Sequence, residues 1–347
     1  MTESKLRWGI ISTGVIAHTL ARALRRSENG TLVAVASRSQ EAASNFGREF
    51  DVPHAHGSYQ ALLENPDVDV VYIATPHPAH AEWAIAAARA KKHVLCEKPL
   101  AMNHAQVSRM VQAAREHDVF LMEAFMYRCH PQTERLISLL KEGTLGQVRA
   151  IQATFGIDGA FPAEHRVINH ALGGGGILDL GCYPVSMARL VAGVATGAAF
   201  SDPLELHALG HVGERSRVDE YTCAILKFPG EIVASLATSV QLWQDNVVRI
   251  LGSEGRLTLP TPWHPGNDRD FSEIRIDRPG RDPEVLRIPS PETAYVYQVD
   301  AVAAQIANRE AREMTLADSL GNARTLDLWR SALGLTFAAD ADERLDG

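Results

Sequence analysis

Residues 8–20 read WGIISTGVIAHTL, and this stretch decides the fold of the first part of the chain. The run LRWGII at residues 6–11 has the composition of a buried strand, and a helical pattern follows it. Between them, residues 12–17 read STGVIA, where a dinucleotide-binding turn has G-x-G-x-x-G/A. Gly14 lets the backbone approach a pyrophosphate, and Ala17 is small enough for close packing of helix on strand. The pattern predicts a phosphate-binding turn with a serine at the first glycine position.

That serine, Ser12, is the departure from the fingerprint. Serine gives up the easy access of glycine to positive φ, and it gains a hydroxyl that can donate to a phosphate oxygen. Amides at the start of the following helix supply further donors and partial positive charge. Alone, a one-glycine turn is weak evidence and could be a chance string in a buried helix. If it is a working variant, the cofactor phosphates contact Ser12, Thr13, Gly14, Val15 and Ile16.

The surrounding pattern favours the working variant. Short runs rich in Val, Ile and Leu recur at residues 6–12, 31–37, 69–75, 92–97 and 118–124. They show little polar alternation, which is typical of strands buried on both faces of a parallel sheet. Helical patterns lie between them, for example at residues 78–92 and 103–118. Strands alternating with helices of this length predict βαβ units and a Rossmann-type, doubly wound parallel sheet.

After residue 125 the pattern changes. A helical pattern at residues 131–143 leads into strand-like runs at residues 147–156, 204–212, 221–228, 231–240, 246–252, 256–260 and 273–276. Short connections between them favour an antiparallel sheet, and two helical patterns, near 292–308 and 317–337, close the chain. We therefore predict an α/β chain with two domains. An NADP-binding Rossmann domain spans residues 1–126, and an α+β domain with an open, mostly antiparallel sheet spans residues 127–347, binding substrate and a partner subunit.

The end of the second strand indicates which nicotinamide cofactor binds. An NAD enzyme usually places Asp or Glu there to accept from the ribose 2′-hydroxyl. This chain reads VASRS at residues 35–39, so Ser37 and Arg38 offer donors instead. A guanidinium suits a 2′-phosphate, although Arg38 could also be a solvated loop residue. We expect NADP(H), with NAD(H) possible.

Bulk composition excludes several classes of function. The net charge of -8 argues against nucleic acid or an anionic membrane as the main partner. No run reaches the ~18 uninterrupted apolar residues of a membrane span, and residues 1–12 contain no long apolar run before a cleavage site, so we expect no secretory signal. The four cysteines are far apart in sequence, which is typical of free thiols in a reducing cytoplasm. We expect a cytoplasmic protein.

Two motifs carry candidate chemistry. Residues 97–99 read EKP directly after a strand, at the sheet edge where open α/β folds bind ligands. Asp179 and Tyr183 in LDLGCYPV are four residues apart and would share a helix face, with Pro184 at the first helical position. Tyr183 would then lie at the helix N-terminus, where partial positive charge favours a phenolate, and a nearby Lys98 would lower its pKa. The plainer alternatives are a surface lysine and a buried core tyrosine.

Together, several stretches resemble one family. They are WGIISTGVIA, ATPHPAH, CEKPLA, MEAFMYRCHP, GGGGILDLGCYPV and the closing DSLGNARTLDLWRSA. The chain resembles the Gfo/Idh/MocA oxidoreductases from end to end, and within them the branch of dimeric dihydrodiol dehydrogenase and NADP-dependent D-xylose dehydrogenases. A serine at the first glycine position also occurs in that branch.

The resemblance implies roles for residues at matching positions. Lys98, Asp179 and Tyr183 would be catalytic, with Lys98 beside the nicotinamide. Arg128 and Arg166 would contact substrate, and His130 would reach the same cleft. The cofactor would also contact Thr75, Pro76, His77, His80 and Glu97. Where the family more often has Asp-Pro, this chain has Asn169-His170, so its substrate contacts differ.

Paired histidines at 54 and 56 and at 77 and 80 raise the question of zinc, but no cysteines are spaced to complete a site, and we expect no metal. The leading function is an NADP-dependent dehydrogenase or reductase acting on a sugar, polyol or cyclic diol. The alternative is a non-catalytic NADP-binding sensor of the same fold. A biliverdin-type reductase is disfavoured, because that branch lacks the full set of motifs. We expect a homodimer that pairs through the C-terminal sheet.

Overall fold

In the computed structural model, which describes residues 5–266 and 269–341, the chain divides into two compact units. The N-terminal unit comprises the described residues up to Ala101 together with Ala105–Cys129 and Glu292–Ser319. The C-terminal unit comprises Met102–His104, His130–Pro291 and the described residues from Leu320 onward. The first major cut, after Cys129, lies close to the boundary expected at residue 126.

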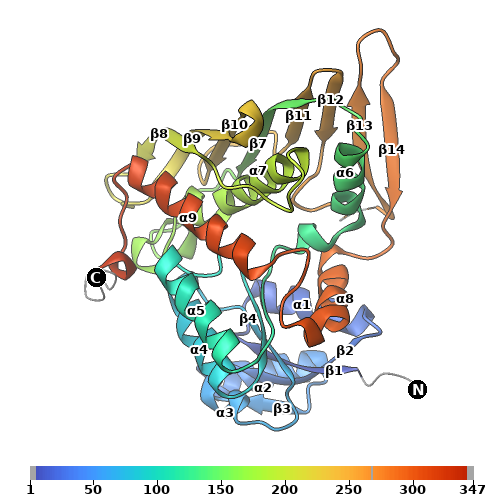
Figure 1. Cartoon of the computed structure of the whole chain (residues 1–347). Helices are drawn as coiled ribbons and strands as arrows, with labels where there is room; N and C mark the ends of the chain where they lie inside the picture. The colour runs from blue at the N-terminus through green and yellow to red at the C-terminus, as the bar shows by residue number, and fades with distance from the viewer. Residues whose placement is uncertain (1–4, 267–268, 342–347) are drawn as a thin grey trace. The chain divides into compact units, whose positions relative to one another are not determined.

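A six-stranded parallel sheet forms the centre of the N-terminal unit, in the order β3-β2-β1-β4-β5-β6 (Figure 1). The strands are β1 Leu6–Ile11, β2 Gly30–Ala36, β3 His54–His56, β4 Val70–Ile73, β5 His93–Cys96 and β6 Leu121–Glu123. The helices of the first 120 residues are α1 Val15–Arg26, α2 Gln40–Phe50, α3 Tyr59–Leu63, α4 His80–Arg89 and α5 His104–Glu116. This arrangement confirms the predicted doubly wound sheet.

The strand order defines the ligand-binding edge of this sheet. The chain moves outward from β1 to β2 and β3, then returns to the other side of β1 with β4, β5 and β6. Right-handed crossovers therefore place α1 and α2 on one face, and α4 and α5 on the other. The order reverses between β1 and β4. Open α/β sheets bind ligands at such a reversal, beyond the carboxyl ends of the strands.

Residues 292–319 follow the second sheet in sequence but belong to the N-terminal unit. Helix α8 Ala294–Gln305 packs against α1 and against the short helix η2 Met126–Cys129. The hydroxyl of Ser27 donates to Asp300 at 2.7 Å, and Arg26 donates to Glu292 at 2.7 Å. These contacts join α8 to α1. A single domain boundary at residue 126 therefore does not describe the N-terminal unit, which includes residues 292–319.

The C-terminal unit is built on an eight-stranded sheet in the order β14-β13-β12-β11-β7-β10-β9-β8 (Figure 1). Its strands are β7 Val148–Gly156, β8 Glu205–Val212, β9 Asp219–Phe228, β10 Ile232–Ser239, β11 Val248–Gly252, β12 Gly255–Leu259, β13 Phe271–Asp277 and β14 Glu284–Pro289. Only β7 and β10 pair in parallel, so the open, mostly antiparallel sheet is confirmed. Two strands, β3 and β14, were not predicted, since β3 is short and β14 is rich in charge.

Helices cover one part of this sheet. They are α6 Pro131–Lys141, α7 Cys182–Ala195 and α9 Leu316–Ala332, of which α9 crosses the cut after Ser319. Helix α7 packs against β7 and β10. The helical stretch His170–Ala195 is long and apolar enough to span a membrane by composition, but its apolar window is 100% buried within the fold. This stretch is therefore the core helix of the unit.

Candidate active site

The turn between β1 and α1 begins at Ser12, a residue with a positive φ. Ser12 has φ 93°, so this serine adopts the left-handed conformation that we expected it to give up with the glycine. Its amide donates to the carbonyl of Ala36 on β2 at 2.9 Å, which holds the residue in that conformation. The serine thus reproduces the glycine backbone at a conformational cost of about 1 kcal/mol.

The N-terminus of α1 offers free space and donors. Gly14 is the N-cap of α1, and no side chain caps the helix there. A Cβ atom at Gly14 would meet nothing nearer than the Ser12 Oγ at 3.9 Å. Val15 is 87% exposed, whereas Ala17 is buried against the sheet. Uncapped amides beside open space suit a phosphate group, so this turn fits the pyrophosphate of a dinucleotide.

The end of β2 carries a cation and no acid. The Ser37 amide donates to His56 at 3.1 Å, and Ser39 caps α2 by accepting from Ala42. Arg38 is exposed and lies close enough to Tyr59 to affect it: burial raises the pKa of the Tyr59 hydroxyl, and the charge of the Arg38 guanidinium partly offsets that rise. Among the described residues no carboxylate forms an ion pair with Arg38. Its guanidinium is therefore available to a 2′-phosphate.

Beyond β4 the chain presents a buried hydroxyl that lacks a partner. Thr75 is 8% exposed, and its Oγ1 has no hydrogen-bond partner within the described part of the chain. Pro76 precedes the short helix η1 His77–Ala79, and His77 is buried. A buried hydroxyl without a partner is costly, and a bound ligand at this sheet edge would supply one. His80, in contrast, is fully buried, with both ring nitrogens near main-chain carbonyls, and no part of its ring is exposed to a cofactor.

The segment after β5 places Lys98 at the carboxyl edge of the sheet. The Lys98–Pro99 peptide bond is cis, and Lys98 is half-buried while both neighbours are buried. The hydroxyl of Tyr72 donates to the Glu97 carboxylate, and the Glu97 amide donates to Ile73 at 3.0 Å. Glu97 is thus held against β4 beside the lysine, and its contact with the cofactor stays a prediction.

In the C-terminal unit, Asp179 lies on the π-helix η5 Ile177–Gly181, which runs directly into α7. Tyr183 is the second residue of α7 and Pro184 the third, so Pro184 is not at the first helical position. Our expectation that Tyr183 lies at a free helix N-terminus is therefore wrong. The preceding π turn supplies carbonyls to the first amides of α7, and the partial charge of a free N-terminus is not available to the phenol.

The structure brings two predicted substrate residues together. Arg166, on η3 Arg166–Ile168, pairs with the Asp179 carboxylate at 2.9 Å. The Asp179 side chain is 4% exposed, while that of Arg166 is 48% exposed. The guanidinium therefore compensates a buried carboxylate and still presents donors outward.

Tyr183 lies in an aromatic cluster that the sequence did not reveal. The ring of Tyr183 lies edge-on to the rings of Phe155 and Trp263, with 5.2 Å and 5.8 Å between the ring centres, and all three side chains are buried. Trp263 is fixed by its indole N–H, which donates to Thr154 at 2.8 Å. The only signals were an aromatic residue at the end of a strand-like run and the tryptophan in TPWHP. The cluster provides an apolar wall beside the candidate proton acceptor.

Two other candidates have structural partners. Arg128 is 7% exposed and forms a buried ion pair with Asp318 at 2.8 Å, within the N-terminal unit. His130 is fully buried and caps α6, where its Nδ1 accepts from the Gln132 amide at 3.0 Å. Contacts of Arg128 or His130 with substrate stay predictions.

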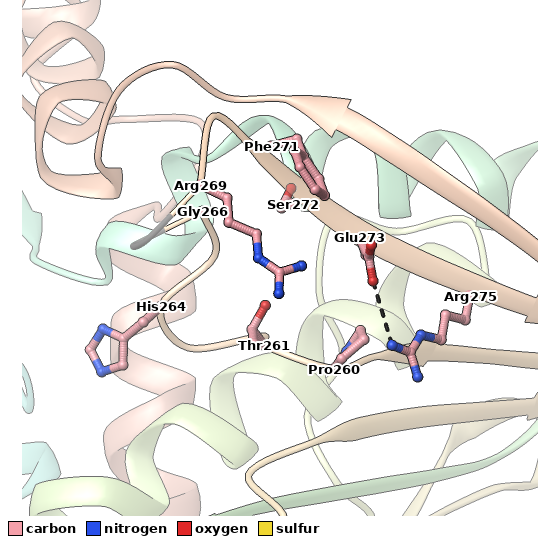
Figure 2. Close-up of a pocket in the computed structure, with 9 residues that line it drawn as sticks. All are labelled: Pro260, Thr261, His264, Gly266, Arg269, Phe271, Ser272, Glu273 and Arg275. Atoms are coloured by element: carbon pink, nitrogen blue, oxygen red, sulfur yellow. Dashed lines mark hydrogen bonds and ion pairs between the residues drawn. The ribbon is translucent and has the colours of Figure 1, made fainter.

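A cavity of about 270 Å³ lies elsewhere in the C-terminal unit. Figure 2 shows its lining: Pro260, Thr261, His264, Gly266, Arg269, Phe271, Ser272, Glu273 and Arg275. None of the predicted site residues lines it. The Arg269 guanidinium lies between Thr261 and Ser272, and the ring of His264 points away from it. His264 connects this region to the aromatic cluster through Phe155, at 6.2 Å between ring centres.

The histidine pairs have ordinary contacts. His54 lies on β3 near Asp67, at 3.3 Å, and its ring stacks on that of His56. Among the described residues no three His, Cys, Asp or Glu side chains gather in a way that could hold a metal ion. The four cysteines, Cys96, Cys129, Cys182 and Cys223, are free.

The sequence is similar to known proteins over nearly its whole length. Residues 6–125 match an oxidoreductase family with an NAD-binding Rossmann fold, GFO/IDH/MocA, and residues 133–258 match its C-terminal domain. The trans-1,2-dihydrobenzene-1,2-diol dehydrogenase of Bos taurus is 35% identical over 347 residues, covering 96% of this chain and 99% of the relative. Its namesake in Danio rerio is 34% identical over 340 residues, covering 97% and 99%.

Solved structures of related proteins share the fold of this chain. The 3-ketoreductase KijD10 of Actinomadura kijaniata, in complex with NADP and TDP-benzene, superposes with a TM-score of 0.84 at 30% identity, over 95% of this chain and 98% of that one. The aldose-aldose oxidoreductase of Caulobacter crescentus, complexed with glycerol, has a TM-score of 0.84 at 25% identity, over 95% and 97%.

Proposed function

Because the chain belongs to the Gfo/Idh/MocA family of NAD(P)-binding oxidoreductases, we propose that it transfers hydride between NADP(H) and a hydroxyl-bearing carbon of a sugar, polyol or cyclic diol. One observation carries the proposal. The uncapped, open turn of Gly14 and the half-buried Lys98 both lie at the carboxyl edge of one parallel sheet. A cofactor bound along this edge would have its phosphates at the turn and its reactive ring toward the lysine.

The side chains supply proton transfer and charge stabilisation. Bound NADP(H) supplies or accepts the hydride at C4 of the nicotinamide. During oxidation the Tyr183 phenolate takes the proton of the substrate hydroxyl and becomes a neutral phenol, and the Lys98 ammonium stabilises the negative charge that develops on the substrate oxygen. Asp179 orients Arg166, whose exposed donors bind other substrate hydroxyls. Reduction runs the same steps backwards.

The aromatic cluster indicates the shape of the substrate. Phe155 and Trp263 flank Tyr183, so the carbon that reacts lies beside an apolar wall. The faces of a sugar ring or a cyclic diol are apolar, and their edges carry hydroxyls that suit Arg166. The names of the relatives likewise refer to a diol, an aldose and a TDP compound.

The catalytic roles are tested by replacing one atom group at a time. Tyr183→Phe and Lys98→Met should each lower kcat by about two to four orders of magnitude, while the Kd for NADP+ changes less than about threefold. Tyr297→Phe and Lys141→Met, on α8 and α6, are matched controls that should leave kcat unchanged. Full activity of either site variant would remove that residue from the mechanism. Cofactor binding with no turnover on a panel of aldoses, polyols and trans-diols would favour the sensor.

NADP preference follows from Arg38. A charge-assisted contact with the 2′-phosphate contributes about 1.5–3 kcal/mol, so Arg38→Asp should lower the kcat/KM ratio of NADP+ to NAD+ by about ten- to a hundredfold. Arg48→Asp, an exposed change on α2, is the control. An unchanged ratio in Arg38→Asp would leave the 2′-phosphate without its proposed partner.

We also propose a cytoplasmic homodimer that pairs through the outer face of β8, β9 and β10. Leu209 is 84% exposed, and Tyr221, Ile225 and Val233 are each at least 40% exposed on this face. Adjacent apolar side chains on an open sheet favour association of two copies. Ile225→Lys should convert a dimer into a monomer in light scattering after size exclusion. A monomeric wild type would refute the proposal.

A further inference from the structure

The main chain around Lys98 is held by buried side chains of the N-terminal unit. On the strand side, Glu97 binds the Tyr72 hydroxyl. On the far side, the Leu100 amide donates to the Glu123 carboxylate at 2.9 Å, and Glu123 is 2% exposed. These contacts fix the residues before and after the Lys98–Pro99 pair. A third contact reaches the pair itself.

His80 makes this third contact. Its Nδ1 lies 2.9 Å from the carbonyl oxygen of Pro99, and its Nε2 lies 2.8 Å from the carbonyl oxygen of Thr75. The ring is 0% exposed and stands at the first residue of α4. It therefore bridges the loop after β4 and the turn after β5. The bridged Pro99 carbonyl belongs to the residue that follows the proposed catalytic lysine.

The surroundings of the ring favour its neutral form. Burial lowers the pKa of His80, and the nearby Lys98 ammonium lowers it further, while the carbonyls of Thr75, Pro99 and Leu100 act in the opposite direction. A neutral imidazole has one N–H and donates to one carbonyl at a time. A neutral ring that donates through Nδ1 holds the Pro99 carbonyl, and only a protonated ring, which adds a positive charge near Lys98, donates to both carbonyls.

We propose that His80 is a positioning residue for Lys98, which ties the Lys98–Pro99 turn to the end of β4 and fixes where the ammonium lies. This inference rests on the proposed catalytic role of Lys98. It also gives His80 a role other than the cofactor contact expected from the sequence, because the ring has no exposed atoms and its nitrogens face main-chain carbonyls.

The test compares His80 with His93, which lies at the start of β5, at the end of that strand remote from Lys98. His80→Leu removes both contacts, and His80→Gln keeps an amide that can donate to one carbonyl. His93 begins β5, is also partly buried, and accepts from the Phe120 amide at 2.9 Å. We expect His80→Leu to lower kcat about ten- to a hundredfold with the Kd for NADP+ nearly unchanged, and His80→Gln to fall between it and the wild type. His93→Leu should keep wild-type kcat.

A double variant separates positioning from a general loss of structure. In the Lys98→Met background, His80→Leu should lower kcat by less than about twofold, because the group that it positions is already absent. Equal effects in both backgrounds would overturn the proposal, as would a wild-type kcat in a folded His80→Leu. A Kd for NADP+ that rises in step with the loss of kcat would make His80 a cofactor ligand instead. A fully active Lys98→Met would overturn the proposed function itself, whatever the His80 variants do.

Discussion

Asp219 connects the C-terminal sheet to the helix that carries the candidate catalytic residues. It begins β9, is 1% exposed, and accepts from the Ile177 amide at 2.6 Å, at the start of the π-helix that contains Asp179. Burial raises the pKa of the Asp219 carboxyl to about 7, and the amides of Ile177 and Gly176 only partly offset that rise. The carboxyl therefore changes charge near neutral pH.

The effect on stability has a definite sign. A carboxyl whose pKa is raised on folding stabilises the fold at low pH, and this stabilisation is lost as pH rises through the folded value. With a folded pKa of about 7 and an ordinary value of 3.8, the carboxyl is protonated in the folded state at pH 5 and ionised at pH 8. Linkage then predicts that the free energy of unfolding falls by about 2.5 kcal/mol between these two pH values.

Asp219→Asn isolates this contribution. The asparagine retains an oxygen that accepts from Ile177 and does not titrate. Urea unfolding followed by tryptophan fluorescence at pH 5, 6, 7 and 8 should show the wild type losing about 2.5 kcal/mol relative to Asp219→Asn. The buried Trp329, whose indole donates to Thr222 at 3.0 Å, reports on this unit. Asp245→Asn, whose side chain is 74% exposed in the wild type, is the control and should follow the wild-type curve. Parallel curves for wild type and Asp219→Asn would refute the reasoning.

Three other changes have outcomes that follow from local geometry. Gly175 has φ +110°, and a Cβ atom there would lie 2.2 Å from the Asp219 side chain, whereas Gly143 has φ +72° and a Cβ atom there would meet nothing within 4 Å. In urea unfolding, Gly175→Ala should therefore lower the free energy of unfolding by about 3 kcal/mol or more, and Gly143→Ala should lower it by about 1 kcal/mol. Equal costs would mean that crowding by the carboxylate is relieved. Burial lowers the pKa of His130 to about 4, so its stabilisation is complete above its ordinary value of 6.5 and is lost as pH falls through 4. His130→Asn keeps the helix cap and should remove about 3 kcal/mol of the destabilisation between pH 7 and pH 4, and an unchanged acid profile would contradict this. Ser12→Gly should raise the free energy of unfolding by about 0.5–1 kcal/mol, because it removes a side chain from φ 93°, and a loss of stability would show that the serine side chain contributes more than its strain costs.

The parts of the fold that could be predicted depend on local sequence. The strands β1, β2, β4 and β5 are short, mostly apolar and followed by helical patterns, so their pairing in a parallel sheet follows from composition and connection length. The same holds for the turn at Gly14, whose function depends on consecutive residues. The Arg166–Asp179 pair was predicted as two site residues through a resemblance, and the structure adds the contact between them.

The parts that could not be predicted depend on contacts between distant positions. Phe155 and Trp263 meet beside Tyr183 because β7 and the loop after β12 are brought together by the sheet, and nothing in either segment alone indicates this. Residues 292–308 read as an ordinary helical stretch, and only the contact of this helix with α1 assigns it to the N-terminal unit. The π turn before Tyr183 is likewise set by Asp219, which lies 42 positions from Ile177.

The central claim is that Lys98 and Tyr183 act on the same substrate oxygen, and a crystal structure with NADP+ and a bound polyol tests it most directly. We expect the Lys98 Nζ and the Tyr183 Oη each to lie within about 3.2 Å of one substrate hydroxyl, whose carbon faces C4 of the nicotinamide. A well-ordered complex in which either side chain points away from that hydroxyl would contradict the mechanism.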